Sequence, residues 1–104
     1  MDKLISKGTR IIDSHGRERI LTGINVCDKG QYVEGGRRIY GKQWDKGLAA
    51  DLREHGMDLI RLGITWDAVE PEPGKYDESY LDFIADILDE CAEAGVYVFL
   101  DMHQ

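Results

Sequence analysis

Cysteine is scarce in this chain, which has two, Cys27 and Cys91, among 104 residues. One pair at that separation is neither a disulfide framework nor a metal-binding motif. The pattern therefore argues against a disulfide-stabilised scaffold and against a cysteine zinc site. Cys91 falls inside a helical period and is interpreted as a small core residue, whereas Cys27 follows a strand and is interpreted as a loop thiol.

Long apolar runs are also missing. No stretch approaches the roughly 20 apolar residues of a membrane span, and residues 1–8 lack the apolar core of a signal peptide. We therefore expect no membrane span and, by default, a cytoplasmic location. The sequence has no zinc-ligand spacing, phosphate-binding loop, dinucleotide fingerprint or nucleophile elbow, so we expect no cofactor and no metal.

Basic residues are outnumbered, with 13 Lys and Arg against 20 Asp and Glu and a formal charge of −7. This balance disfavours nucleic acid and anionic membranes as the main partners, because both repel negative charge. Most of the acidic residues lie on the faces of predicted helices, where solvated surface charge is the simplest interpretation. The 42% apolar content favours a folded globular chain.

Two short apolar runs flank a helical period in the second half of the chain. Residues 59–64 and 96–100 each fit a strand buried on both faces, and residues 77–94 between them have helical spacing. A strand, a helix and a strand in about forty residues form a βαβ unit, which builds a parallel sheet.

The predicted helix at 77–94 has a clear start, a clear end and one apolar stripe. Asp77 is its expected N-cap and Gly95 its expected stop. The stripe follows i, i+3, i+7 and i+10 and consists of Leu81, Ile84, Leu88 and Cys91. In the stiff turn before this helix, Glu70 precedes Pro71 and is interpreted as a loop-shaping residue rather than a general acid.

The N-terminal residues predict a hairpin and a strand. Residues 9–13 and 17–22 flank a glycine-containing turn and form the expected β-hairpin. Residues 23–26 continue as the first strand of the parallel set.

A loop and a helix follow. Residues 27–44 contain four glycines and no period, so we expect a long loop, either functional or simply a flexible connection. Residues 45–55 predict a helix, with Asp45 as N-cap and Gly56 as the signal that ends it.

These elements predict an α/β fold, a hairpin followed by β-α-β-α-β with parallel strands. Right-handed crossovers place both helices on one face of the sheet. Parallel strands that are apolar throughout are usually covered by other elements on both faces of the sheet. The last strand is also left as an unpaired edge. We therefore predict a single partial domain at 1–104, with the hairpin in 1–22 and three strands and two helices in 23–104.

Polar and aromatic residues come directly after both strands of the βαβ unit. Thr65, Trp66 and Asp67 follow the first strand, and Asp101 and His103 follow the second. The C-terminal ends of parallel strands meet at one edge, where α/β folds place their chemistry. Asp101 and His103 are two residues apart and project to the same face, where the carboxylate can orient the imidazole.

Several short motifs together resemble glycoside hydrolase family 5. They are Ile12-Asp13, Gly16-Arg17, Leu21, Gly23-Ile-Asn-Val26, Arg61-Leu-Gly-Ile-Thr-Trp66, Glu70-Pro71, Gly74-Lys-Tyr-Asp77, Tyr80-Leu81 and Leu100-Asp-Met-His-Gln104. The likeness covers nearly the whole chain and is closest to the branch containing endoglycosylceramidases, with cellulases more distant. It implies a (β/α)8 TIM barrel, of which this chain spans the first three strands and two helices.

The resemblance also implies an activity and a set of site residues. The family hydrolyses β-glycosidic bonds with retention, using glutamates on the fourth and seventh strands, so no catalytic residue is assigned in this chain. Arg61 matches an arginine that supports those carboxylates, and His103 matches a histidine lining the sugar subsite. With His103, we expect Asp101 and Trp66 to bind substrate.

Each assignment has a structural alternative. Arg61 could form a plain ion pair; without the glutamates it must reach Asp58, Asp101, another chain or water, because an unpaired buried guanidinium is costly. His103 could be a strand-end histidine at a frayed terminus, and Trp66 could be a packing residue.

Three functions remain open at this point. The first is an N-terminal fragment of a retaining β-glycosidase, inactive alone, whose parent acts on a β-glycoside or glycolipid. The second is a self-associating structural fragment, covered by further copies in a homo-oligomer or by a complementary barrel fragment. The third is a weak carbohydrate-binding remnant.

Overall fold

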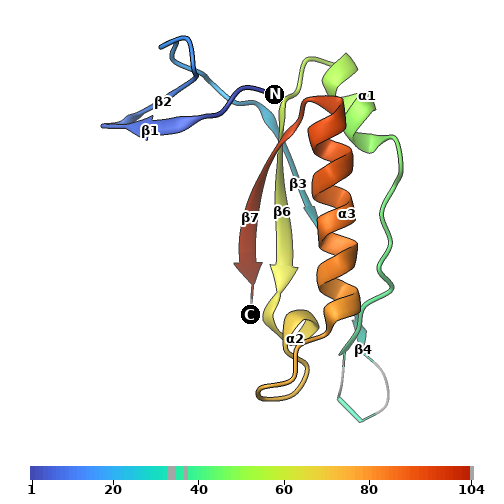
Figure 1. The fold of residues 1–104 in the computed structure, drawn as a ribbon. Helices are drawn as coiled ribbons and strands as arrows, with labels where there is room; N and C mark the ends of the chain where they lie inside the picture. The colour runs from blue at the N-terminus through green and yellow to red at the C-terminus, as the bar shows by residue number, and fades with distance from the viewer. Residues whose placement is uncertain (33–34, 37, 104) are drawn as a thin grey trace.

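The computed structural model is organised around a three-stranded parallel sheet (Figure 1). The structure describes residues 1–32, 35–36 and 38–103. The strands, in sheet order, are β3 (Gly23–Cys27), β6 (Leu59–Thr65) and β7 (Tyr97–His103). Gly23, Leu59 and Tyr97 are register partners, so the three strands start level and run the same way. The predicted parallel sheet is confirmed.

Helix α3 (Glu78–Ala94) covers one face of this sheet, and the short helix α1 (Leu48–Glu54) packs against α3 on the same side (Figure 1). Ile60 and Leu62 of β6 are 0% and 4% exposed beneath them. The other buried apolar side chains of the core are Ala49, Leu52, Ala68, Tyr80, Ile84, Ile87, Cys91 and Val96. Burial of these side chains is the main stabilising contribution to the fold.

The ends of α3 are as predicted, and its buried stripe is as predicted in part. The Asp77 side chain accepts a hydrogen bond from the Tyr80 amide at 3.1 Å, and Gly95 ends the helix with φ at 78°. Tyr80 is buried in place of Leu81, which is 36% exposed, and Ile87 is buried more fully than Leu88. The prediction is confirmed for Ile84 and Cys91 and wrong for Leu81, and Leu88 is partly buried at the margin of the core, because the buried face is centred on Tyr80, Ile84, Ile87 and Cys91.

The N-terminal hairpin forms, but upstream of its predicted position. Strands β1 (Ile5–Lys7) and β2 (Arg10–Ile12) pair antiparallel across a turn in which Gly8 has φ of 61°. The predicted pairing of 9–13 with 17–22 is reduced to a single bridge between Ile12 and Glu18. Glycine supplies the left-handed turn at Gly8 without steric cost, and this fixes the hairpin there.

Three short elements were not predicted, and one helix starts late. Strands β4 (Gln31–Tyr32) and β5 (Arg38–Ile39) pair within the expected loop, and helix α2 (Trp66–Val69) directly follows β6. Asp45 is not the N-cap of α1, because Gly47, with φ of 96°, occupies that position. Glycine there makes the turn that starts the helix three residues later than predicted.

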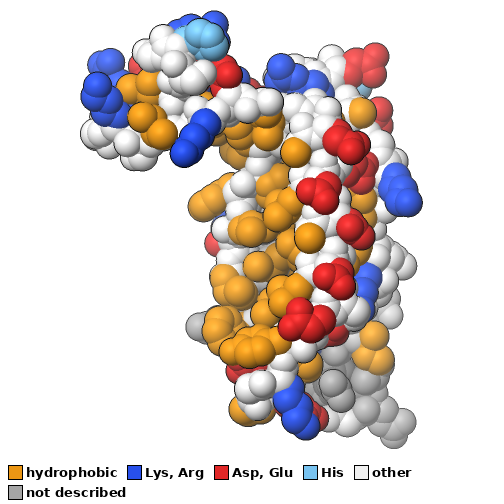
Figure 2. All heavy atoms as spheres, viewed as in Figure 1, with side chains coloured by type: hydrophobic (Ala, Val, Ile, Leu, Met, Phe, Trp, Pro, Cys, Tyr) orange, Lys and Arg blue, Asp and Glu red, His pale blue; other side chains and the backbone are white. Residues whose placement is uncertain are grey.

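The sheet face opposite α3 carries no helix among the described residues. Phe99 lies on that face, because it is the register partner of Arg61, and it is 57% exposed. Leu100 and Met102 are the register partners of Leu62 and Ile64, so they lie on the α3 side of β7, where they are 44% and 46% exposed. Figure 2 shows this α3 side, with hydrophobic side chains exposed over the strands beside the helix. The hairpin lies at the N-terminal ends of the strands, where the Tyr97 hydroxyl donates to the Asp2 carbonyl at 2.5 Å (Figure 1). The expected open face and free edge are therefore features of the structure. No helix in the described part of the chain is both long and apolar enough to cross a membrane.

Candidate functional site

A polar cluster lies on the sheet face opposite α3. Side chains alternate along a strand, so Arg61 points away from its buried neighbours Ile60 and Leu62. Asp101 and His103 share this face through the register of β6 and β7. We call Arg61, Asp101 and His103 the inner-face cluster.

Arg61 is held by neighbours on both adjacent strands. Its guanidinium forms an ion pair with the Asp101 carboxylate on β7, and Nη1 donates to Oδ1 of Asn25 on β3 at 3.5 Å. Of the partners left open by the sequence, the structure therefore selects Asp101. Asp58 instead contacts Arg19, at 3.8 Å.

Asp101 also contacts the histidine, so one carboxylate serves both partners. Nε2 of His103 lies 2.8 Å from Oδ2 of Asp101. His103 is the last residue of β7 and is paired in register with Thr65, so it is part of the sheet rather than a frayed end. The carboxylate thereby fixes the position of a guanidinium and an imidazole on one exposed face.

Gly63 makes room for this arrangement. A Cβ at Gly63 would lie 2.7 Å from Sγ of Cys27 and 3.1 Å from Cδ2 of His103. The two side chains therefore come together above a position where only a hydrogen fits. Sequence reasoning did not assign Asn25 or Gly63 to the site. The sequence signals that could have identified them are that Asn25 is an isolated polar residue in one apolar strand and Gly63 an isolated glycine in another.

Trp66 and Glu70 lie outside the inner-face cluster. Trp66 is the first residue of α2 and is 53% exposed, so it is not a core packing residue. Glu70 accepts a hydrogen bond from Tyr76, and this contact, with the carboxylate charge, raises the pKa of the phenol above 10.0. That contact agrees with a loop-shaping role for Glu70.

The cluster offers the groups that a sugar needs. Sugar hydroxyls both donate and accept hydrogen bonds, and Asp101, Arg61 and His103 provide an acceptor and donors within contact of one another. The cluster contains one carboxylate, which Arg61 and His103 both already contact. Its chemistry is therefore that of binding and orientation rather than of paired acid and nucleophile.

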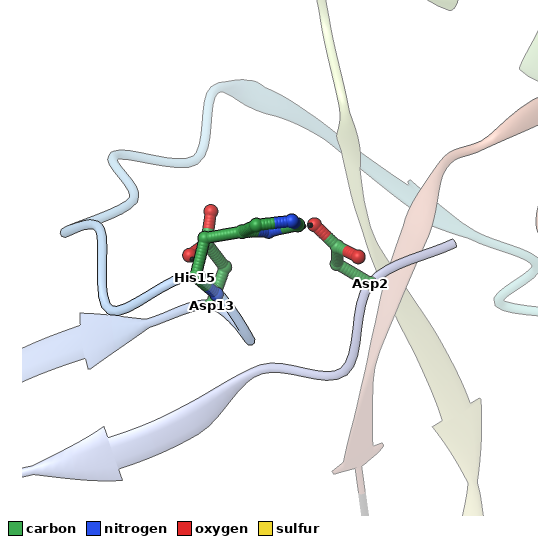
Figure 3. A group of neighbouring side chains, drawn as sticks. All are labelled: Asp2, Asp13 and His15. Atoms are coloured by element: carbon green, nitrogen blue, oxygen red, sulfur yellow. Dashed lines mark hydrogen bonds and ion pairs between the residues drawn. The ribbon is translucent and has the colours of Figure 1, made fainter.

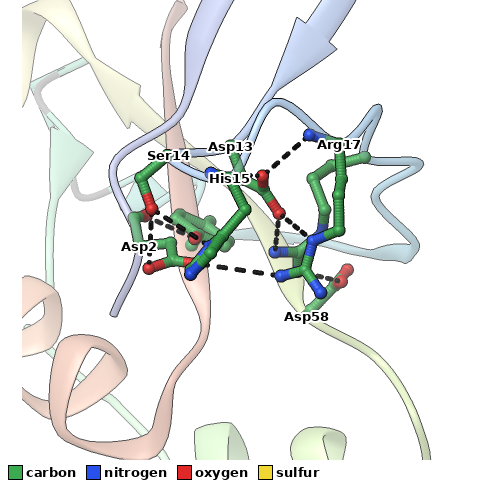
Figure 4. Close-up of polar contacts among 8 residues, drawn as sticks. Asp2, Asp13, Ser14, His15, Arg17 and Asp58 are labelled. Carbon is green, nitrogen blue, oxygen red and sulfur yellow. Dashed lines mark hydrogen bonds and ion pairs between the residues drawn. The ribbon is translucent and has the colours of Figure 1, made fainter.

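A second polar cluster lies at the opposite end of the sheet, around the N-terminal segment. Asp2, Asp13 and His15 bring their ligand atoms within 4.8 Å of one another (Figure 3). The fully buried Asp13 carboxylate accepts hydrogen bonds from the amides of His15 and Arg17, at 2.9 and 3.0 Å. It also accepts one from Nε of Arg17 at 2.9 Å (Figure 4). Because these donors already occupy the carboxylate, we interpret the cluster as structural rather than as a metal site.

The pKa of Asp13 reflects this network. Burial by itself raises the pKa of the carboxyl, but the hydrogen bonds from Arg17 and His15 and the charge of Arg17 hold it below the ordinary value of 3.8. Asp13 therefore stays ionised and closes the turn at 13–17.

Comparison with known proteins identifies the family. Residues 12–104 match the model described as cellulase, glycosyl hydrolase family 5. The chain belongs to glycosyl hydrolase family 5. The resemblance found in the motifs is confirmed, and the three parallel strands are part of a (β/α)8 barrel.

Curated relatives of this family 5 chain include proteins named for glycolipids. Endoglycoceramidase I of Rhodococcus hoagii is 35% identical over 102 residues, covering 97% of this chain and 20% of the relative. The glucosylceramidase of Aspergillus fumigatus is 46% identical over 117 residues, covering 93% of this chain and 15% of the relative.

A solved structure of sterylglucosidase 1 from Cryptococcus neoformans gives a TM-score of 0.78 at 29% identity. The match covers 97% of this chain and 17% of that one. The family 5 chain thus spans about one fifth or less of the length of the relatives it matches.

Proposed function

We propose that these residues form the N-terminal part of a retaining β-glycosidase barrel whose substrate is a glycolipid or another β-glycoside. They make one partial domain that supplies a sugar-binding face. Asp101, His103 and Trp66 face the sugar, and Arg61 supports the site. The inner-face cluster carries this proposal, because it lies on an uncovered face with Asp101 and His103 at the C-terminal end of β7. The names endoglycoceramidase and glucosylceramidase favour a glycosylated lipid.

Hydrolysis needs more than this chain provides. Retaining glycosidases use two carboxyl groups about 5–5.5 Å apart, one as nucleophile and one as acid. The family resemblance places both on the fourth and seventh strands, and the chain spans the first three. Asp101 cannot replace the pair, because it is a single group engaged by Arg61 and His103. We expect no turnover by the 104 residues alone, and weak sugar binding.

A turnover assay tests the inactive part of the proposal. The purified chain and its His103→Ala variant are incubated with a fluorogenic β-glucoside, and both should release no more fluorophore than buffer does. Fluorophore release by the parent chain that decreases in the His103→Ala variant would overturn the expectation of an inactive chain.

Titration with cellobiose, followed by amide NMR, tests the expected sugar binding. Shifts at residues 101–103 are expected, and unchanged spectra would remove the sugar-binding role.

The exposed side chains of β7 favour a second candidate function, self-association. An open strand edge beside apolar residues pairs readily with another chain, and homo-oligomers most often close by a twofold axis. A second copy, or a complementary barrel fragment, would cover Phe99, Leu100 and Met102. Light scattering over a range of concentrations should show a mass above that of one chain. A constant monomer mass would exclude the homo-oligomer.

A further inference from the structure

A cleft of about 300 Å³ lies apart from the inner-face cluster, with none of that cluster's residues in its lining. Its walls come from residues 38–42, from α2 and from the start of α3. The polar and aromatic side chains that line it are Arg38, Tyr40, Lys42, Asp67, Asp77 and Tyr80. Its volume is at the small end of the range for ligand pockets, about 300–1,000 Å³.

One wall of the cleft is held by a tyrosine and an aspartate. The Tyr40 hydroxyl donates to Oδ1 of Asp67 at 2.5 Å. The Tyr40 ring packs against Tyr80, with ring centroids 6.0 Å apart. Burial raises the pKa of Tyr80 to about 12, and burial with the Asp67 contact raises that of Tyr40 above 10.0. Both phenols are therefore neutral near pH 7, and Tyr40 stays a hydrogen-bond donor.

A lysine also lines the cleft. Lys42 Nζ contacts the Ser79 hydroxyl, which in turn donates to Oδ1 of Asp77 at 2.6 Å. Lys42 has φ of 52°, a left-handed conformation that non-glycine residues rarely adopt. Its ammonium group lies at the cleft, beside the first turn of α3.

The polar groups of the described lining indicate a neutral, hydroxylated ligand. Among the described residues, Asp67 accepts one hydrogen bond, at Oδ1, which leaves Oδ2 able to accept another. In the described lining, two cations, Arg38 and Lys42, balance two carboxylates, Asp67 and Asp77, so a charged ligand gains no net attraction. Hydroxyl groups suit this mixture, because each one can both donate to a carboxylate and accept from a cation.

We propose that this cleft binds a single neutral sugar ring, with Asp67 accepting hydrogen bonds from ring hydroxyls and Tyr40 packing beside the ring. The choice of a sugar over other polyols rests on the proposed function, since α2 follows β6 at the end of the sheet that carries His103. The cleft is then a second sugar contact, separate from the inner-face cluster.

Amide NMR titration of the 104-residue chain with D-glucose tests the proposal. The expected result is saturable shifts at Tyr40, Asp67 and Ala68. Asp67→Asn should weaken the affinity by about tenfold or more, since hydrogen bonds to a charged group contribute about that much. Asp86→Asn, the same substitution on the exposed face of α3, should leave the affinity unchanged.

Tyr40→Phe is a second variant that keeps the ring and removes the hydroxyl, and it should also weaken glucose binding. Shifts confined to residues 61 and 101–103 would overturn the cleft proposal while supporting the proposed function. Equal glucose affinity in Asp67→Asn and the parent would overturn it, as would an absence of shifts up to 0.1 M glucose. Stronger shifts with phosphate or choline than with glucose would overturn the assignment of a neutral ligand.

Discussion

Asp101 is the residue through which the inner-face cluster is connected. It contacts both Arg61 and His103, and no other carboxylate of the described residues contacts either one. The side chains of Arg61 and His103 are partly exposed, at 43% and 41%, so their contacts with Asp101 fix their positions more than they stabilise the fold. The main role of Asp101 is therefore to hold the side chains of Arg61 and His103 in a fixed relative position.

We predict that Asp101→Asn leaves stability within about 1 kcal/mol of the parent but releases the His103 ring. Thermal unfolding measures the first effect, and the NMR signals of the His103 imidazole measure the second. Asp86→Asn serves as the control and should change neither. Unchanged imidazole signals in Asp101→Asn would show that the carboxylate does not orient the ring.

Gly63 supports a second prediction at the same scale. A methyl group there meets Cys27 and His103 at distances below ordinary contact, and overpacking of this kind typically costs about 1–3 kcal/mol. Gly63→Ala should therefore lower the free energy of unfolding, and Cys27→Ala in the same chain should recover part of the loss. Gly41→Ala is the control, because its nearest neighbour lies 3.5 Å away. Equal denaturation midpoints for all variants would contradict the argument.

At the scale of the elements, α3 organises the covered face, and its N-cap is open to a direct test. Hydrogen bonds from Ser79 and from the Tyr80 amide lower the pKa of Asp77 below 3.8. We predict that Asp77→Ala lowers the melting temperature by roughly 4–8 °C near pH 7, as for the loss of one cap in a domain of this size. Asp86→Ala should cause a much smaller change.

The pH dependence of this effect has a defined sign. Because the folded pKa of Asp77 is lowered, its contribution is complete above the ordinary value of 3.8 and is lost as the pH falls through the lower folded value. The difference in melting temperature between Asp77→Ala and the parent should therefore shrink on acidification below pH 3.8. A difference that grows there would contradict the cap assignment.

The elements with strong periods were predictable, and the others were not. The two strands flanking α3, the Asp77 cap and the Gly95 stop follow from local patterning and from residue chemistry. The position of the first hairpin depended on which of two nearby glycines made the turn, and local sequence does not decide this. The strands at 31–32 and 38–39 are too short to leave a period, and Tyr80 is buried only because of the neighbours that tertiary structure brings to it.

The site was predictable to the same extent. Asp101 and His103 could be placed together because they are two residues apart on one strand. The contact of Arg61 with Asp101 depends on the register between β6 and β7, which the sequence left open among several partners. Asn25 and Gly63 come from two different strands and join the site only once the sheet is assembled.

At the scale of the whole molecule, the residues that the structure describes leave the sheet with two free edges and one uncovered face. β6 is paired on both sides, whereas β3 and β7 are paired within the sheet on one side each. We predict that amide hydrogen exchange is slowest in β6, and that protection of β7 rises with protein concentration if copies cover it. Protection of β7 equal to that of β6 in dilute solution would show that the chain covers its own edge.

The most direct test of the sugar-binding face uses a chimera, in which these residues are joined to the remainder of a relative. Residues 1–104 replace the matching segment of the Rhodococcus hoagii endoglycoceramidase I, which is 35% identical here. Hydrolysis of a glycolipid by the folded chimera is then measured. We predict activity that Asp86→Asn preserves and that His103→Ala and Arg61→Met each reduce at least tenfold. A folded chimera whose activity survives both of these substitutions would contradict the role of the inner-face cluster.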